Sequence, residues 1–134
     1  ALLNEHAEES IWNEKINARI CTIEGLVLLK LVANNDRPAR TKDLIDIQQI
    51  IKLYFEVFSD EVYEDHFDVM EKHNEKETDY IQQVSAYVIG RKLKTILNKD
   101  EALLKRITKI LQQDKGNYWN NLLKGLTENE TPRT

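Results

Sequence analysis

The most informative part of the chain is residues 28–46, which read Leu-Leu-Lys-Leu-Val-Ala-Asn-Asn-Asp-Arg-Pro-Ala-Arg-Thr-Lys-Asp-Leu-Ile-Asp. An apolar helical pattern ends here in an Asn-Asn-Asp turn, and Pro38 disfavours the helical conformation at Arg37. A second helical pattern begins after Thr41, and it carries two carboxylates in its first turns, Asp43 and Asp46. The sequence therefore predicts a corner between two helices at which charges of both signs gather.

The composition favours one domain built mainly of helices. A chain of 134 residues can bury its own core, and 4 Gly and 2 Pro leave few tight turns. The net charge of −4 argues against a general nucleic-acid binder, because such binding depends on cations that neutralise phosphates. The longest apolar run, residues 25–32, is interrupted by Lys30 and is too short to span a membrane. The single Cys21 cannot form an internal disulfide, which favours a cytoplasmic location.

Apolar residues at three-and-four spacing predict a mostly α fold, a bundle of five to six helices. Thr22, Thr41 and Asp100 are suitable N-caps for three of these helices. The expected helices cover residues 23–34, about 42–58, 59–72, 80–97, 101 to shortly before Gly116, and 118–126.

The two ends of the chain differ from this pattern. Residues 15–20 alternate like a β-strand, but an isolated strand has no ladder partner for its backbone groups. We therefore expect residues 1–22 to be a linker or the end of an α/β domain whose sheet is missing here. Residues 23–126 form the helical domain, and the polar residues 127–134 are expected to be a disordered tail. The start at Ala1 fits either removal of an initiator Met or a chain cut from something longer.

Two interpretations of the charged corner remain open. Asp43 and Asp46 share a helix face and Lys42 can pair with Asp46 at i,i+4, which is sufficient for a purely structural role worth a few tenths of a kcal/mol. Alternatively, Lys30 and Arg37 face the same corner, so that cations for phosphate oxygens stand beside carboxylates for orientation or proton transfer. Spacing alone does not show whether these side chains converge.

The corner and its surroundings resemble a known family. Residues 22–33 read Thr-Ile-Glu-Gly-Leu-Val-Leu-Leu-Lys-Leu-Val-Ala, residues 36–38 Asp-Arg-Pro, and residues 41–47 Thr-Lys-Asp-Leu-Ile-Asp-Ile. Together with Glu-Asp-His-Phe-Asp at 64–68, they are similar to the region that follows the catalytic sheet in AbiEii/AbiGii-type nucleotidyltransferases. These bacterial proteins belong to the polymerase-beta-like superfamily, and some act as toxins in toxin–antitoxin or phage-defence systems. The similarity is specific over about residues 16–70.

The resemblance implies roles for five residues and also a missing half of the site. Lys30, Arg37 and Lys42 would contact nucleotide phosphates, and Asp43 and Asp46 would be the catalytic residues that orient an acceptor or act as a base. The family's first two motifs, a Gly-Ser start with an acid and a further metal-binding acid, are absent before Ile23. No metal ligands or cofactor are therefore expected in this chain. Mg²⁺ and a nucleoside triphosphate are expected for a full-length parent.

The implied function is the C-terminal helical part of a nucleotidyltransferase, inactive alone. Its implied partners are the missing N-terminal nucleotidyltransferase domain, an acceptor RNA or protein, and a second copy in a homodimer, with no membrane. The alternative is a stand-alone helical binding or regulatory module, similar to an antitoxin, that offers the acidic residues 56–79 to a basic partner.

The other polar groups are best explained by structural or surface roles. His66 and His73 lack the spacing of a tetrahedral metal set, and Cys21 has no base nearby in sequence. The basic residues from Arg91 to Lys109 and the acidic residues 56–79 are best explained as two helix surfaces of opposite sign that lean toward each other, rather than as an RNA-binding surface.

Overall fold

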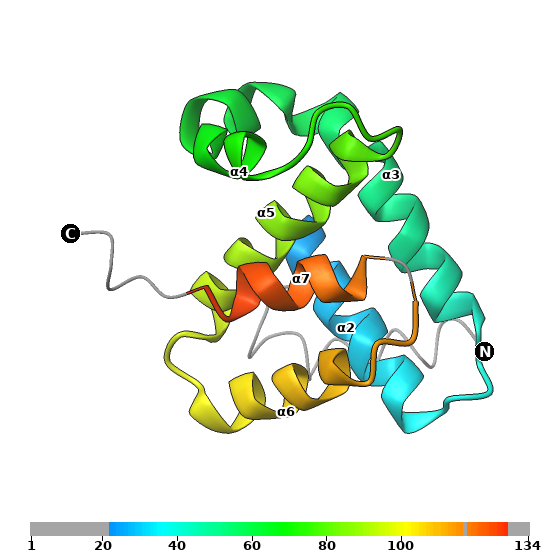
Figure 1. Ribbon diagram of the computed structural model, residues 1–134. Coiled ribbons are helices and arrows are strands. Elements are labelled where there is room, and N and C mark those ends of the chain that lie inside the picture. The colour runs from blue at the N-terminus through cyan, green and yellow to red at the C-terminus, as the bar shows by residue number, and fades with distance from the viewer. Residues whose placement is uncertain (1–21, 117, 129–134) are drawn as a thin grey trace.

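The computed structural model of the protein describes residues 22–116 and 118–128. Over these residues the chain forms six α-helices and no β-strand (Figure 1). The helices are α2 (Ile23–Asp36), α3 (Lys42–Asp65), α4 (Phe67–Lys72), α5 (Tyr80–Leu97), α6 (Glu101–Gln112) and α7 (Trp119–Leu126). The prediction of a mostly α bundle is confirmed. The predicted strand at 15–20 and residues 129–134 of the predicted tail lie outside the described residues.

Local capping explains where several helices begin. The Thr22 side chain accepts a hydrogen bond from the Gly25 N–H at 3.0 Å, and Asp100 accepts one from Leu103 N–H at 3.1 Å. Each bond satisfies one of the backbone donors that a helix start leaves unpaired. Thr41 precedes α3 as predicted, but its side chain makes no capping hydrogen bond. The start of α3 therefore depends more on the preceding turn and on tertiary packing.

The boundary predicted near Phe58 is a kink rather than a helix end. Phe58 leaves helical geometry (φ −116°, ψ 24°), yet helical structure resumes and continues to Asp65. The chain leaves the helix only at His66, and α4 follows as a separate short helix. The prediction of one continuous helix over residues 59–72 is therefore wrong. Acidic residues after Ser59 suit a helix start, but they do not require one, because a helix can bend and keep most of its hydrogen bonds.

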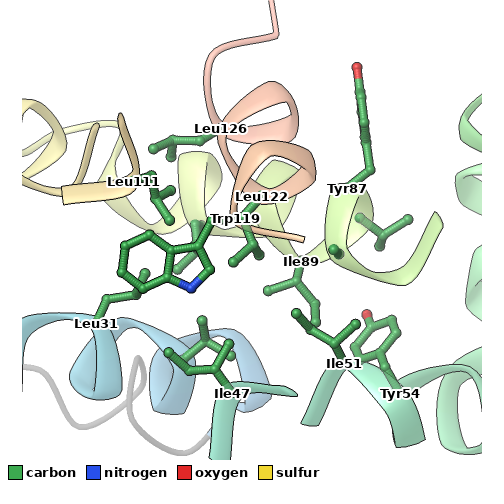
Figure 2. Close-up of a cluster of buried hydrophobic side chains, with 14 of the residues drawn as sticks. Leu31, Ile47, Ile51, Tyr54, Tyr87, Ile89, Leu111, Trp119, Leu122 and Leu126 are labelled. Carbon is green, nitrogen blue, oxygen red and sulfur yellow. The ribbon is translucent and has the colours of Figure 1, made fainter. Parts of the chain in front are cut away.

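The centre of the bundle is α5, which contacts every other helix of the described chain. Every residue from 84 to 90 is buried, so this helix is enclosed on all sides. Around it α7 crosses on one side, α2 and α3 pack on another, and α6 closes the far end (Figure 1). Figure 2 shows Trp119 of α7 lying between Leu111 of α6 and Leu31 of α2. The indole is 2% exposed and is therefore part of the core.

Two glycines allow α5 and α7 to approach each other closely. A Cβ on Gly90 would clash with the backbone carbonyl oxygen of Leu122, and a Cβ on Gly125 would clash with that of Tyr87. The clashes are reciprocal, since each helix presses its backbone against the glycine of the other. In both cases the obstacle is backbone, which cannot move aside like a flexible side chain. Gly90 is therefore needed for packing and is not merely tolerated in a helix.

We expect Gly125→Ala to lower the free energy of unfolding by about 1–3 kcal/mol, because overpacking must push α5 and α7 apart. This loss exceeds the roughly 1 kcal/mol that alanine gains in helix propensity. Gly116→Ala is the matched control, since its nearest neighbours are Trp119 side-chain atoms at 3.9 Å. Chemical denaturation of both variants measures the difference. Equal stabilities would contradict the close α5–α7 packing.

Candidate functional site

The charged corner lies where α2 ends and α3 begins. Residues 37–41 connect the two helices, which pack against each other as antiparallel neighbours (Figure 1). A loop this short keeps the end of α2 beside the start of α3. Groups about seven residues before the end of one helix can therefore meet groups on the first turns of the next. The corner is thus a tertiary feature that local sequence encodes almost completely.

Two of the predicted site residues, Lys30 and Lys42, converge on the carboxylate of a third, Asp46 of α3. Lys30 Nζ donates a hydrogen bond to Asp46 Oδ2 at 2.7 Å, and Lys42 Nζ donates to the same oxygen at 3.3 Å. Lys30 Nζ also lies 3.9 Å from Asp43 Oδ1. Lys30 is thus placed between both carboxylates, and the i,i+4 pairing of Lys42 with Asp46 is confirmed. Lys42 remains 70% exposed, so its own ion pair contributes little.

Asp43 is the unusual member of this corner, because it is a carboxylate that is only 1% exposed. It forms ion pairs with two cations, with Arg40 Nε 3.7 Å from Oδ2 and Lys30 Nζ 3.9 Å from Oδ1. Within the described chain, Oδ2 accepts no hydrogen bond. Burying a charge costs free energy unless partners compensate it. Asp43 is therefore compensated by ion pairs with two cations, while its Oδ2 has no hydrogen bond from the described residues.

Two further residues complete the corner and were not predicted from the sequence. Asn34, fully buried near the end of α2, donates from Nδ2 to the backbone carbonyl of Arg40 at 3.1 Å. This hydrogen bond fixes the backbone of the interhelix loop at Arg40 and so positions the Arg40 side chain near Asp43. The i,i+3 spacing of Arg40 and Asp43 was the available signal for their ion pair. Asn34 gave no such signal, because an asparagine near a helix end usually indicates only a turn.

Arg37 is not drawn into the corner. It is the C-cap residue of α2, its backbone N–H donates to the Ala33 carbonyl, and its side chain is exposed. Across residues 22–116 and 118–128, no hydrogen bond or ion pair of this side chain is found. Of the five predicted site residues, the structure therefore joins Lys30, Lys42, Asp43 and Asp46 and leaves Arg37 on the surface beside them.

The corner holds Asp46 in its ionised form. The hydrogen bond from Lys30 is the main reason that the pKa of Asp46 lies below its usual range, and Lys42 adds to the effect. A carboxylate with a lowered pKa is a weak base. Asp46 is therefore suited to orient cations and hydrogen-bond donors rather than to take a proton. The exposed faces of Lys30 and Lys42 remain able to meet an anion.

A second charged cluster centres on Arg91 of α5. Its guanidinium donates to both oxygens of Asp68, at 3.1 and 2.7 Å, and to both oxygens of Glu128, at 2.8 Å each. Tyr87 Oη donates to Glu128 at 2.6 Å. Burial opposes ionisation of Glu128, but the hydrogen bonds from Arg91 and Tyr87 outweigh it and lower its pKa. Sequence analysis missed this cluster, because residues 68, 91 and 128 are far apart along the chain.

The acidic and basic surfaces do lean toward each other, as predicted. Arg91 pairs with Asp68, and Lys92 Nζ lies 2.5 Å from Glu61 Oε2. Arg91 and Lys92 are thus neutralised within the protein and are poorly placed to contact RNA. Of the predicted tail, Thr127 and Glu128 are described, and both are hydrogen-bonded to the bundle.

The two described histidines, His66 and His73, have structural roles. Arg91 Nη1 lies 3.1 Å from His66 Nδ1, and burial followed by the charge of Arg91 lowers the pKa of His66. His73 Nδ1 lies 2.8 Å from the backbone carbonyl of Val69. No group of three or more His, Cys, Asp or Glu side chains in the described ranges is arranged to hold a metal ion.

Comparisons with known proteins do not assign this chain to a family. No family model matches it, and no curated protein or solved structure matches it either. Among the described helices, none combines the length and apolar character needed to cross a lipid bilayer.

Lowering the pH should weaken the Lys30–Asp46 interaction. Because the folded-state pKa of Asp46 is lowered, its stabilisation is present above the unfolded pKa of about 3.9 and is lost as the pH falls through the folded value. In a double-mutant cycle of Lys30→Met and Asp46→Asn, we expect a coupling of up to about 1 kcal/mol at pH 7 that decreases as the pH falls below the unfolded pKa of Asp46.

The cycle of Lys42→Met and Asp46→Asn is the control. Its coupling should be smaller at every pH, because Lys42 is exposed and its bond is longer. Unfolding by urea at several pH values measures both cycles. A Lys30–Asp46 coupling that does not change with pH would contradict the assignment.

Proposed function

We propose that this chain is the C-terminal helical part of a nucleotidyltransferase and that the α2–α3 corner is its contribution to the active site. The observation that carries the proposal is Asp43, a buried carboxylate between Lys30 and Arg40 whose Oδ2 accepts no hydrogen bond from the described residues. A carboxylate chosen only for stability would be expected to be better satisfied, because leaving a buried acceptor unpaired costs about 1–3 kcal/mol. Residues that break this rule gather at functional sites.

The roles follow from exposure and bonding. Lys30 is fixed by Asp46 on one side, yet its side chain is 24% exposed, so its ammonium group can also donate to a phosphate oxygen. Lys42 and Arg37 are exposed beside it and can add positive charge toward a polyphosphate. Asp43 and Asp46 hold these cations in place. In this arrangement both carboxylates are positioning residues, since Asp43 is buried beneath the cations and Asp46 already accepts two hydrogen bonds.

The metal chemistry of such a transferase belongs elsewhere in the protein. The described residues do not fit a Mg²⁺ site, since no suitable group of acidic side chains is assembled. We propose that a nucleotidyltransferase domain preceding this chain supplies the metal ligands and the nucleoside triphosphate. The helical part then binds phosphate oxygens and helps to place an acceptor, an RNA or a protein hydroxyl. A cytoplasmic location and a role as the toxin of a toxin–antitoxin pair are part of this proposal.

The competing function is a helical module that binds a basic partner. It is favoured by a set of acidic side chains on α3, α4 and the following loop that remain exposed. These are Glu56, Asp60, Glu64, Asp65, Glu71 and Glu75. Glu61 and Asp68 belong to the same stretch but are paired with Lys92 and Arg91. Pull-down with a basic partner that persists in Lys30→Gln and Asp43→Asn variants would favour this alternative.

The transfer proposal is tested on the protein that includes the sequence encoded upstream of this chain. We expect Lys30→Gln and Asp43→Asn each to abolish transfer of labelled nucleotide, while the free energy of unfolding changes by no more than about 1–2 kcal/mol. Lys99→Gln is the control. It removes an exposed cation from the loop that follows α5, and this variant should retain activity.

Three results would overturn the proposal. The first is an upstream sequence without a Gly-Ser loop followed by acidic residues. The second is normal transfer by both corner variants. The third is loss of folding in both variants, which would assign the corner a structural role only.

A further inference from the structure

His66 is the single residue that joins α3 to α4, since α3 ends at Asp65 and α4 begins at Phe67. Its backbone is part of both helix ends. The His66 N–H donates to the Val62 carbonyl at 3.0 Å, and the His66 carbonyl accepts from the Val69 N–H at 2.9 Å. The imidazole is only 11% exposed, because it packs against α5. A movement of this ring therefore acts directly on the junction that places α4.

The two described histidines hold their protons on opposite ring nitrogens. His66 Nδ1 lies 3.1 Å from Arg91 Nη1, and a guanidinium can only donate, so this Nδ1 is an unprotonated acceptor. His73 Nδ1 lies 2.8 Å from the Val69 carbonyl, which can only accept, so that Nδ1 carries the proton. A second proton on His73 goes to Nε2 and leaves its hydrogen bond intact. On His66 the second proton must go to Nδ1, where Arg91 is bound.

Charged side chains from four parts of the fold surround the contact between His66 and Arg91. They are Glu61 and Asp65 of α3, Asp68 of α4, Lys92 of α5 and Glu128 after α7. Asp68 and Glu128 each accept two hydrogen bonds from Arg91, so the guanidinium cannot turn away from His66.

The balance of these charges opposes a second proton on His66. Burial is the main reason that the pKa of His66 lies below its usual value, and the positive charge of Arg91 is the next. Glu61 and Asp65 act in the opposite direction. Glu61 Oε2, however, is 3.7 Å from His66 Nε2 and is already paired with Lys92 Nζ at 2.5 Å. The fold therefore favours the neutral imidazole.

The helix that follows this junction depends on its tertiary contacts. With six residues, α4 is too short to be stable alone, and it lies at the outer edge of the bundle (Figure 1). It is held by burial of Val69 and Met70, by the ion pair of Asp68 with Arg91, and by a hydrogen bond from Tyr80 Oη to the Met70 carbonyl. Local opening of such an element costs less free energy than unfolding of the whole domain.

We propose that His66 is a pH-sensitive latch of the α3–α4 junction. The neutral imidazole binds Arg91 and keeps α4 against α5. When a proton from solvent adds to the Nδ1 lone pair, the hydrogen bond from Arg91 is lost and two cationic donors face each other. The imidazolium then turns toward water, and α4 loosens. This device does not depend on the proposed transfer activity, because it follows from the contacts of His66 alone.

The latch opens at mildly acidic pH. Because the folded-state pKa of His66 lies below its usual value of about 6.5, the closed junction binds a proton less readily than the open one. The free energy needed to open the junction therefore decreases as the pH falls below about 6.5. Asp68 and Glu128 have lowered pKa values and stay ionised in this range, so the ion pairs of Arg91 are not what acid removes first.

Amide hydrogen exchange of residues 67–72 in the 134-residue chain tests the proposal, measured at about pH 7.5 and about pH 5 and corrected for intrinsic rates. In His66→Asn the amide oxygen can replace Nδ1 as the acceptor for Arg91 but does not titrate. His73→Asn is the matched control, since its amide N–H can replace the donor to Val69. We expect acid to lower the protection of α4 relative to α5 by roughly tenfold in the wild type and in His73→Asn, and to leave it unchanged in His66→Asn.

Unchanged protection of the wild-type α4 at the lower pH would overturn the proposal. An equal acid-induced loss in His66→Asn would do the same, because another group would then be responsible. Nitrogen NMR of the wild-type chain gives a readout that does not require the variants to fold. It should show His66 protonated on Nε2 at neutral pH and titrating below about 6.5, with His73 protonated on Nδ1. A neutral His66 that carries its proton on Nδ1 would contradict the latch.

Discussion

The close contact between α5 and α7 is the constraint on which the rest of the structure depends. Gly90 and Gly125 let two helix backbones touch where a methyl group on either side would not fit. Because α7 lies so near, its Trp119, Leu122 and Leu126 complete the core around the central helix (Figure 2). The same approach carries Glu128, just beyond α7, within reach of Arg91. The cluster of Arg91, Asp68 and Glu128 thus depends on the absence of side chains at the two glycines.

The two charged clusters differ in how well their groups are satisfied. Around Arg91 the guanidinium is bound by two carboxylates in paired hydrogen bonds, a geometry that stabilises and specifies one arrangement. At the α2–α3 corner, Asp43 is almost completely buried, yet its Oδ2 accepts no hydrogen bond from the described residues. The first cluster therefore has the character of a structural joint. The second retains unused bonding capacity, which is why we propose a function for the corner and not for Arg91.

The sequence by itself determined the class of fold, most helix positions and most of the charged corner. Helical periodicity and capping residues are local signals, and a loop of five residues brings Lys30 to Asp43 and Asp46 almost automatically. These local signals could not predict the kink at Phe58. Residues 59–61 are typical of a helix start, but they do not reveal whether the backbone hydrogen bonds of the preceding helix continue through them.

Only the tertiary structure decided which local features matter. It showed that Gly90 is required, that Asp43 is buried, that Arg37 stands apart, and that Asp68, Arg91 and Glu128 meet. Each of these facts depends on the distance between segments remote in sequence. Steric contact and burial are properties of the packed bundle, whereas helical periodicity is a property of the chain.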